Sequence, residues 1–137
     1  MSQYHKQKTS YKDEGSLVAG LNAMGYETVE VHETAQNLVG YHGDLRAEKA
    51  HVIVRRKYID RAANDLGFVK EKDGSFSAIV SAYDSTKHST QWFIDLKKKY
   101  SEHLLMKTAA KQGCRLVQRK DANGKIQIRL MDPRVRA

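Results

Sequence analysis

Hydrophobic and polar residues alternate along several short stretches of this chain, which is the pattern of a strand with one buried and one solvated face. Other stretches place apolar residues three or four positions apart, as an amphipathic helix does. The alternating stretches predict strands over residues 3–10, 27–32, 50–58, 66–72, 75–83, 115–121 and 125–131.

Two helices are predicted between these strands. The first begins after Asp13, whose side chain suits a helix N-cap, and ends at Gly25. The second spans residues 89–112, ends at Gly113 and is expected to lie across a sheet. Its apolar stripe consists of Trp92, Phe93, Leu96, Tyr100, Leu104 and Ala110.

Two dipeptides mark tight turns between neighbouring strands. Asp73-Gly74 and Asn123-Gly124 supply residues that accept positive φ angles, and they predict two-residue hairpin turns, of type I′ at Asp73-Gly74. The predicted fold class is α+β, a mainly antiparallel sheet with two helices packed on one face, in the order β-α-β-β-β-β-β-α-β-β. Since no Pro-, Gly- or Ser-rich linker interrupts the pattern, residues 1–137 are expected to form a single domain with a frayed C-terminal tail.

The net charge of +8 is unevenly distributed along the chain. Residues 1–84 hold 11 Lys and Arg against 12 Asp and Glu, a net charge of −1, whereas residues 85–137 hold 13 against 4, a net charge of +9. A basic segment attracts phosphate-bearing partners, because binding releases their counterions. The alternative is a solvated surface that only keeps the protein in solution.

The composition excludes several classes of protein. No apolar run approaches the roughly 20 residues that cross a bilayer, and the N-terminal residues lack the apolar core of a signal peptide. A single cysteine, Cys114, leaves no internal disulfide and no cysteine-rich zinc site. We therefore expect a soluble intracellular protein in a reducing compartment.

The most distinctive segment combines two glycines with clustered charge. It and the motifs around it are Val31-His32-Glu33, Gly40-Tyr41-x-Gly43-Asp44-x-Arg46-x-Glu48-x-Ala50, Val54-Arg55-Arg56-Lys57-Tyr58-Ile59, Asn64-Asp65-x-Gly67-Phe68 and Tyr83-Asp84. In order and spacing these motifs resemble the hypothetical chloroplast reading frame thirty-five family, an uncharacterised family of plastids, cyanobacteria, other bacteria and phages. The resemblance covers nearly the whole chain. It implies fold and size but no catalytic residue.

The same resemblance bears on location and partners. It implies the cytoplasm of a bacterial or phage-infected cell, or the plastid stroma. It also offers an AAA-type ATPase as a protein partner.

The glycine loop itself predicts a site for a small anionic ligand. It lacks the Gly-Lys-Ser/Thr ending of a P-loop and the third glycine of a dinucleotide fingerprint. Backbone N–H groups next to glycine, with arginines close in sequence, can nevertheless cradle a phosphate. The alternative is that the glycines only permit a tight turn and that Asp44 pairs with Arg46. The predicted ligand-binding residues are Gly40, Tyr41, Gly43, Asp44, Arg46, Arg55, Arg56 and Lys57.

The C-terminal hairpin predicts a second, basic surface. With a two-residue turn at Asn123-Gly124, Lys120 and Arg129 share a face opposite the isoleucines. Because that face has no aromatic residue for base stacking, sequence-independent phosphate contact is expected. The apolar face would hold Val117, Ile126, Ile128 and Leu130. The predicted nucleic-acid-binding residues are Lys97, Lys98, Lys111, Lys120, Lys125 and Arg129.

No metal site, cofactor or catalytic centre is predicted. The six histidines have no i, i+4 pair and no neighbouring cysteine ligand, and His103 is expected to be partly buried in the second helix. Cys114 has no recognisable base and is expected to be a small packed thiol. The chain is therefore expected not to be an enzyme.

Nucleic acid is the first candidate for an anionic partner of this basic module. The first alternative is a small nucleotide held by the glycine loop and the Arg55-Arg56-Lys57 strand at a homo-oligomer interface, in a sequestering or sensing protein. The second alternative is a protein adaptor for an AAA-type ATPase.

Overall fold

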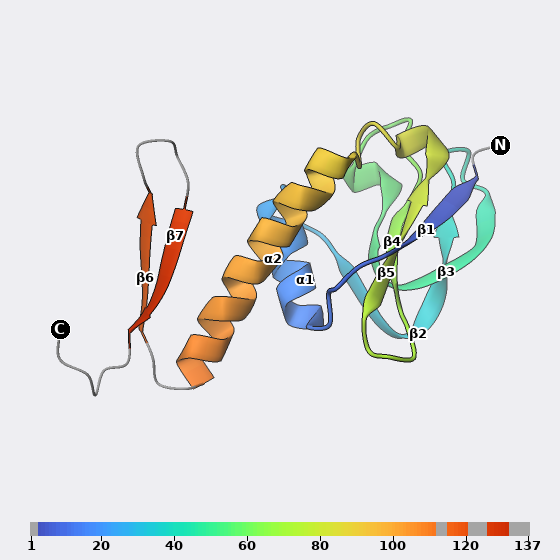
Figure 1. The fold of residues 1–137 in the computed structure, drawn as a ribbon. Coiled ribbons are helices and arrows are strands. Elements are labelled where there is room, and N and C mark those ends of the chain that lie inside the picture. The colour runs from blue at the N-terminus through green and yellow to red at the C-terminus, as the bar shows by residue number, and fades with distance from the viewer. Residues whose placement is uncertain (1–2, 112–114, 121–125, 132–137) are drawn as a thin grey trace. The chain divides into compact units, whose positions relative to one another are not determined.

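The computed structural model describes residues 3–111, 115–120 and 126–131, with side chains described for residues 3–111. The chain divides into two compact units, Met1–Tyr100 and Ser101–Ala137. Figure 1 shows the elements, which in chain order are β1 (Tyr4–Lys8), α1 (Glu14–Ala23), β2 (Glu30–Val39), β3 (Leu45–Val54), the 3-10 helix η1 (Arg56–Tyr58), β4 (Leu66–Lys70), β5 (Phe76–Ser81), the 3-10 helix η2 (Ala82–Asp84), α2 (Thr90–Lys111), β6 (Arg115–Lys120) and β7 (Ile126–Met131).

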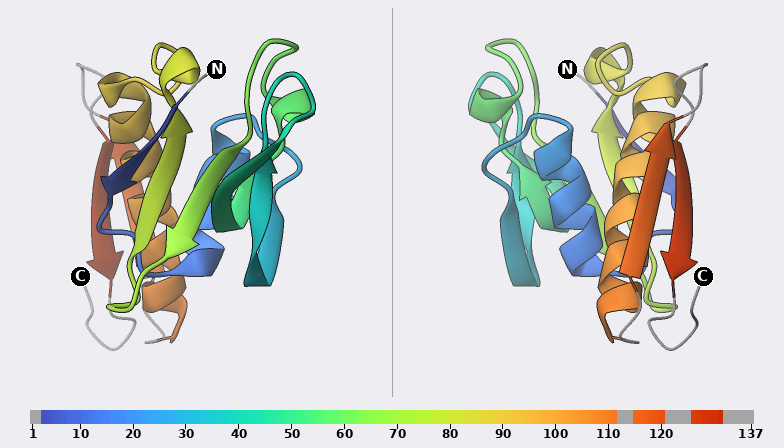
Figure 2. Two further views of the ribbon diagram at one scale, coloured as in Figure 1. Left: turned by 90° about the vertical axis from the view of Figure 1, so that its right-hand side faces the viewer. Right: turned by 90° about the vertical axis from the view of Figure 1, so that its left-hand side faces the viewer.

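The predicted α+β fold class is confirmed. In the first unit, five strands form an antiparallel sheet in the order β1-β5-β4-β3-β2, and α1 and the first turns of α2 lie on one face of it (Figures 1 and 2). In the second unit, β6 and β7 pair as an antiparallel hairpin. Four strands separate the helices, which agrees with the four ranges predicted there and is one fewer than the predicted element order contains. The assignment of residues 1–137 to a single domain stays a prediction, and the C-terminal tail lies outside the described residues.

The first helix begins and ends as its sequence predicts. The Asp13 carboxylate accepts hydrogen bonds from the Ser16 backbone N–H at 3.0 Å and from its hydroxyl at 2.6 Å. Gly25, with φ +108°, follows the last turn in a conformation that L side chains rarely adopt. Both ends are therefore specified locally.

The two helices approach closely at Gly20. A Cβ there would lie 3.2 Å from the backbone nitrogen of Tyr100, so α2 packs where α1 has no side chain. The Tyr100 hydroxyl accepts hydrogen bonds from the backbone N–H groups of Lys12 and Asp13, at 3.0 and 2.9 Å. Tyr100 thus fixes the start of α1 against α2.

The sheet is buried on both faces. On the helix side, Phe68 contacts Tyr11, which packs on Tyr100. A separate core on the other face contains Leu38, Ala50, Ile53 and Ile79. The long β2–β3 hairpin closes over this face at Gly67, where a Cβ would meet the Cβ of Ala50 at 2.6 Å. Two-sided burial explains why Val52, Ile53 and Val54 are all fully buried.

The β4–β5 turn differs from the predicted type I′ turn. Lys70 pairs with Phe76, and the Glu71 N–H donates to the Ser75 carbonyl at 2.8 Å, which leaves a three-residue loop. Gly74 has φ +87°, but Asp73 does not have the positive φ that type I′ requires. The Asp73 carboxylate instead accepts the Ser75 N–H at 2.9 Å. The type I′ assignment is therefore wrong.

The β6–β7 register also differs from the prediction. Lys120 pairs with Ile126, and Val117 pairs with Arg129. A two-residue turn at Asn123-Gly124 would pair Lys120 with Gln127, so the predicted register is wrong by one residue. Such a slip moves every residue of one strand to the opposite face relative to its partner. The turn residues themselves lie outside the described residues.

Other boundaries shift near the glycine loop. β2 continues to Val39, beyond the predicted end at His32, with two register irregularities in its pairing to β3. β3 begins at Leu45 and ends at Val54, so Arg56–Tyr58 forms a 3-10 helix where a strand was predicted. In α2, Ala109 is buried and Ala110 is exposed, the reverse of the predicted stripe.

The described residues contain neither a membrane-spanning helix nor a cluster of metal ligands. No described helix has the length and apolar character needed to cross a membrane. Within the described ranges, no three or more His, Cys, Asp or Glu residues are grouped so as to hold a metal ion.

Candidate functional site

A buried carboxylate, Asp65, joins three segments at one end of the sheet. One carboxylate oxygen accepts the Val39 N–H at 2.7 Å and the Arg55 guanidinium at 2.8 Å. The other oxygen accepts the Arg56 N–H at 2.7 Å. Asp65 is only 1% exposed, so these bonds replace the water it lost on folding. The ends of β2 and β3 are thereby fixed to the start of β4.

The neighbouring Asn64 extends this network to two more loops. Its backbone N–H donates to the Asp84 carboxylate at 2.9 Å, and its side-chain amide donates to the Ser81 hydroxyl at 2.9 Å. Its side-chain oxygen accepts the Tyr41 N–H at 3.0 Å. The loops at 40–44, 55–65 and 82–88 therefore meet at one end of the sheet.

The predicted ligand arginines are engaged within the protein. The Arg55 guanidinium binds both carboxylate oxygens of Glu30, at 2.8 and 3.0 Å, which raises the pKa of Arg55 and lowers that of Glu30. The Arg56 guanidinium donates to the carbonyls of Ala63 and Arg61, at 3.1 and 2.8 Å. Both arginines hold the loop between β3 and β4.

The glycine loop is closed by its own hydrogen bonds. The N–H of Gly40 donates to the Asp44 carbonyl and that of Gly43 to the Gly40 carbonyl, both at 2.8 Å. Backbone N–H bonds from Asp44 itself, then Arg46 at 3.4 Å and the His42 backbone, lower the pKa of the Asp44 carboxyl. Gly43 has φ +79°. The groups that would cradle a phosphate are engaged in the turn.

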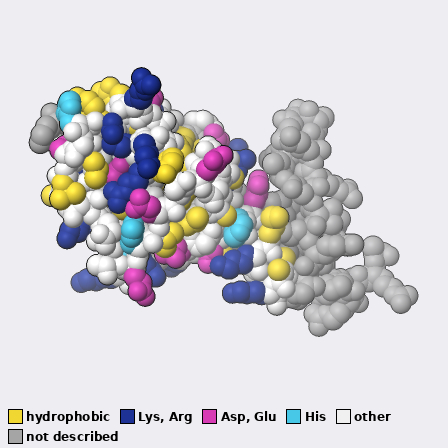
Figure 3. Space-filling view, turned by 180° about the vertical axis from the view of Figure 1, so that it is seen from behind, with side chains coloured by type: hydrophobic (Ala, Val, Ile, Leu, Met, Phe, Trp, Pro, Cys, Tyr) yellow, Lys and Arg dark blue, Asp and Glu magenta, His cyan; other side chains and the backbone are white. Residues whose placement is uncertain are grey.

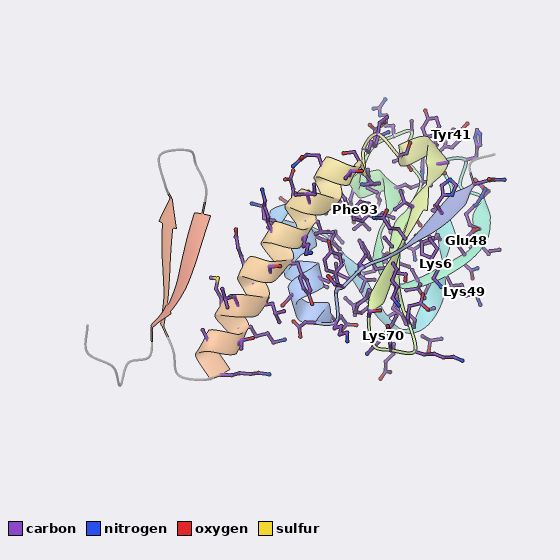
Figure 4. All side chains as sticks on the ribbon, in the orientation of Figure 1. Lys6, Tyr41, Glu48, Lys49, Lys70 and Phe93 are labelled. Atoms are coloured by element: carbon purple, nitrogen blue, oxygen red, sulfur yellow. The ribbon has the colours of Figure 1, made fainter. Side chains whose placement is uncertain are left out.

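Two tyrosines project from the loops that Asn64 joins. Tyr41 is 39% exposed and Tyr83 is 55% exposed. Their rings are nearly parallel, at 10°, with centroids 5.9 Å apart. The His42 ring lies 3.8 Å from the Tyr41 ring, and the Lys87 ammonium lies over Tyr83 at 5.6 Å. Figure 4 shows Tyr41 at the end of the sheet where these loops meet. We call Tyr41, His42, Tyr83 and Lys87 the tyrosine platform.

One family comparison matches most of the chain. A family model described as a protein of unknown function, DUF1257, matches residues 20–130. This chain belongs to the DUF1257 family. Comparisons with curated proteins and with solved structures found no match. The family's name among chloroplast reading frames and its range of organisms stay predictions.

The region that matches the DUF1257 model contains the whole tyrosine platform. Two lysines, Lys87 of the platform and Lys57, bring positive charge to this end of the sheet. The Lys87 ammonium is 3.5 Å from the Asp84 carboxylate and 4.0 Å from that of Asp60, and Lys57 covers the exposed ring of Tyr58 at 5.0 Å. In Figure 3, hydrophobic and basic side chains lie next to one another at the upper end of the first unit.

Sequence reasoning selected Tyr41 and Lys57 but missed Tyr83, Lys87, Asn64 and Asp84. The motifs Asn64-Asp65 and Tyr83-Asp84 did carry the family resemblance, and that was the available signal. No sequence pattern indicates that the two tyrosine loops meet, because the contact depends on the buried Asn64 side chain.

Of the predicted nucleic-acid-binding residues of this DUF1257 protein, those that the structure describes lie on α2, β6 and β7. Lys97, Lys98 and Lys111 are exposed on α2. Lys120 and Arg129 are on β6 and β7, but their side chains lie outside the described residues. Lys125 and Cys114 also lie outside them, whereas His103 is half-buried on α2.

The observed hairpin register changes which of these residues share a face. Residues paired across antiparallel strands lie on the same face. Lys120 therefore lies on the face of Ile126, and Arg129 lies on the other face with Arg115 and Arg119. The prediction that Lys120 and Arg129 share a face is wrong.

Proposed function

We propose that this protein binds single-stranded nucleic acid without catalysis, with the tyrosine platform stacking on bases. The observation that carries the proposal is the pair of exposed, nearly parallel rings of Tyr41 and Tyr83. Aromatic side chains bind single strands irrespective of sequence, because every base has a flat face, and each stacked base contributes about 1–3 kcal/mol.

The buried network supports the platform. Asn64 bonds to the Tyr41 backbone and to Asp84, the residue after Tyr83, so the two loops are held together before any ligand arrives. Rings that are already ordered lose little conformational entropy on binding. Lys87 and Lys57 place positive charge beside exposed aromatic rings, which suits the phosphates between stacked bases.

The basic last third of the chain supplies further phosphate contacts in this proposal. Residues 85–137 carry a net charge of +9. Among the residues predicted to bind nucleic acid, Lys97 and Lys98 are exposed on α2. Each phosphate contact releases counterions and so strengthens binding at low salt.

The alternative is a small nucleotide bound at the glycine loop. A phosphate in the glycine loop would have to compete with the bonds that Gly40, Tyr41 and Gly43 donate within the protein. The loop contacts therefore favour a longer strand, whose phosphates meet side-chain cations, over a mononucleotide held by backbone N–H groups.

Fluorescence anisotropy tests the proposal. A labelled oligothymidylate of about 12 nucleotides, within the site size of one small domain, should bind at about 50 mM salt. Tyr83→Phe keeps a flat aromatic ring and should preserve the affinity. Tyr83→Leu keeps apolar area without that ring and should weaken binding by roughly fivefold to a hundredfold.

The controls separate stacking from charge and from a small ligand. Val31→Ala changes an apolar side chain of similar exposure, 45%, on β2 outside the platform and should leave the affinity nearly unchanged. A labelled mononucleotide should bind far more weakly than the oligonucleotide. Absence of oligonucleotide binding, or equal affinities for Tyr83→Phe and Tyr83→Leu, would refute the proposal.

A further inference from the structure

The β1 strand forms one edge of the five-stranded sheet. The Gln3 carbonyl accepts the Ala82 N–H at 2.7 Å, and the Thr9 N–H donates to the Phe76 carbonyl at 3.3 Å. Because hydrogen-bonded and non-hydrogen-bonded pairs alternate in an antiparallel ladder, odd-numbered residues of β1 bond to β5. The N–H and C=O groups of Tyr4, Lys6 and Lys8 therefore point away from the sheet.

A groove of about 300 Å³ runs beside the end of this edge strand. Its apolar lining comes from Tyr11 at the end of the strand segment and from Phe93 and Ile94 in the first turns of α2. Ile94 is 44% exposed. Two basic residues, Lys8 and Lys97, line the same groove. Figure 4 labels Phe93 on α2 and Lys6 on β1.

The charge at this edge favours an acidic partner. Lys6 pairs with Glu71 at 2.6 Å and Lys8 with Asp73 at 3.4 Å, but the two ammonium-bearing side chains are 56% and 74% exposed. Both members of the Lys8–Asp73 pair are at least half exposed, and such pairs contribute little, so Lys8 can turn to another carboxylate at small cost. A second copy of this chain would bring lysines against lysines if it paired through the same strand.

We propose that β1 and this groove bind an extended acidic segment of a partner protein. The segment adds a strand to the sheet through the outward backbone groups of Lys6 and Lys8. It places an apolar side chain over Phe93 and Ile94, and its carboxylates face Lys8 and Lys97. Strand addition of this kind takes affinity from main-chain hydrogen bonds and specificity from pockets for alternate side chains.

Edge lysines have a second explanation, which is protection against aggregation. A strand that is only protected needs no apolar groove beside it. The half-exposed Ile94 and the neighbouring Phe93 favour docking over protection. This surface shares Lys97 with the proposed phosphate contacts but no residue with the tyrosine platform, so the inference does not depend on nucleic-acid binding.

Selection from a displayed library of random peptides of about 12 residues, longer than a typical strand of 5–6, tests the proposal on the full chain. The enriched peptides should lack proline, carry acidic residues at alternate positions and contain one large apolar residue. No enrichment, or enrichment of basic or helix-forming peptides, would overturn it.

Two substitutions at Lys6 separate backbone pairing from charge. Lys6→Pro removes an outward N–H while leaving the β1–β5 bonds, whereas Lys6→Gln removes only the charge. For a synthetic copy of the best enriched peptide, Lys6→Pro should bind roughly fivefold to tenfold more weakly than Lys6→Gln. Equal affinities would show that the peptide does not pair with β1.

A third variant covers the case in which Lys6→Pro alters the fold. Ile94 lies at an exposed position of α2. Ile94→Glu should also weaken binding of the enriched peptide by at least roughly tenfold, because it places a carboxylate where the acidic segment docks. If oligothymidylate displaced the peptide completely, the surface would be assigned to nucleic acid. If the protein sedimented as a dimer that the peptide dissociates, the surface would be assigned to a second copy of the chain. Either result would overturn the proposal.

Discussion

Asp65 is a buried carboxylate that accepts hydrogen bonds from backbone N–H groups. Its carboxylate accepts the N–H groups of Val39 and Arg56 and pairs with Arg55 at 2.8 Å. Arg55 keeps its pairing with Glu30 when Asp65 is removed, so the cost comes chiefly from the two backbone N–H groups that lose their acceptor, about 1–3 kcal/mol each.

Asp65→Ala should therefore lower the free energy of unfolding by about 2–6 kcal/mol. Urea denaturation followed by the fluorescence of Trp92 measures this change. Glu33→Ala, at an exposed position of β2, is a matched control and should change stability by no more than about 0.5 kcal/mol. A loss below about 1 kcal/mol for Asp65→Ala would mean that water replaces the carboxylate without difficulty.

His88 is a buried base in the turn before α2. Neither ring nitrogen has a hydrogen-bond partner among the described residues, and the ring packs against Trp92 at 4.6 Å. Burial lowers the pKa of His88 to about 4, although Asp84 favours the protonated form, and Lys87 lowers the pKa further. The folded protein therefore holds His88 neutral where an unfolded chain would protonate it.

This difference predicts a pH dependence of stability. Because the folded pKa lies below the unfolded value of about 6.5, His88 stabilises the fold fully above that pH. Stability should decline as the pH falls from about 6.5 toward 4, by at most about 1.4 kcal/mol per pH unit from this residue. His88→Leu should flatten the slope between those limits in urea denaturation. An unchanged slope would assign the acid sensitivity to other groups.

At the scale of elements, the hydrophobic pattern predicted which segments form helices and strands, but it did not predict the lengths of the turns. A glycine with positive φ fits both a two-residue turn and a three-residue loop. In the β4–β5 loop, the bond from Ser75 to the Asp73 side chain favours the longer form. The β6–β7 register is likewise shifted by one residue from the two-residue form. Local sequence alone did not distinguish these alternatives.

In the candidate site, the local features were predictable from the sequence, and the contacts between distant segments were not. The positive φ of Gly43 and the Asp44–Arg46 pair are local features, and the sequence pointed to both. The roles of Arg55 and Arg56 depend on Glu30, Asp65 and distant carbonyls, which only the folded chain brings near them.

The conformation of the β4–β5 loop predicts the effect of substitutions at Gly74. Nothing lies within 4 Å of a Cβ built there, so the cost of Gly74→Ala comes from the backbone conformation and should be about 1–2 kcal/mol. Gly74→Asn should cost less, because asparagine tolerates positive φ. Thermal denaturation measures both, with Lys72→Ala at an exposed loop position as the control. Equal stability of the alanine and glycine forms would contradict the observed turn.

At the scale of the whole molecule, the sequence has no recognisable nucleophile with its base and no metal-ligand spacing, so no hydrolytic activity is expected. Purified protein should leave ATP, cyclic dinucleotides and single-stranded nucleic acid intact over hours of incubation. Chromatography of the reaction mixture checks this. Turnover that disappears when His42, Asp44 or Cys114 is substituted would show that the protein is an enzyme.

The charge distribution of the whole chain predicts how binding should depend on salt. Residues 85–137 hold all of the positive excess, and the hairpin register places Arg115, Arg119 and Arg129 on one face. Each cation that meets a phosphate of a single strand contributes about 0.7 to the slope of log affinity against log salt. Replacing these three arginines by glutamine should therefore flatten that slope by about 2 units for oligothymidylate.

Two companion variants make this prediction specific. Replacing Lys97, Lys98 and Lys111 by glutamine removes the same charge from α2, and Tyr83→Leu removes stacking without changing charge. Each charge variant should flatten the salt slope in proportion to the number of phosphates that its surface contacts. Tyr83→Leu should instead lower the affinity by the same factor at every salt concentration, because stacking releases no counterions. If the arginine variant kept the wild-type slope and the α2 variant lost it, the phosphate contacts would lie on the helix and the hairpin would serve another purpose.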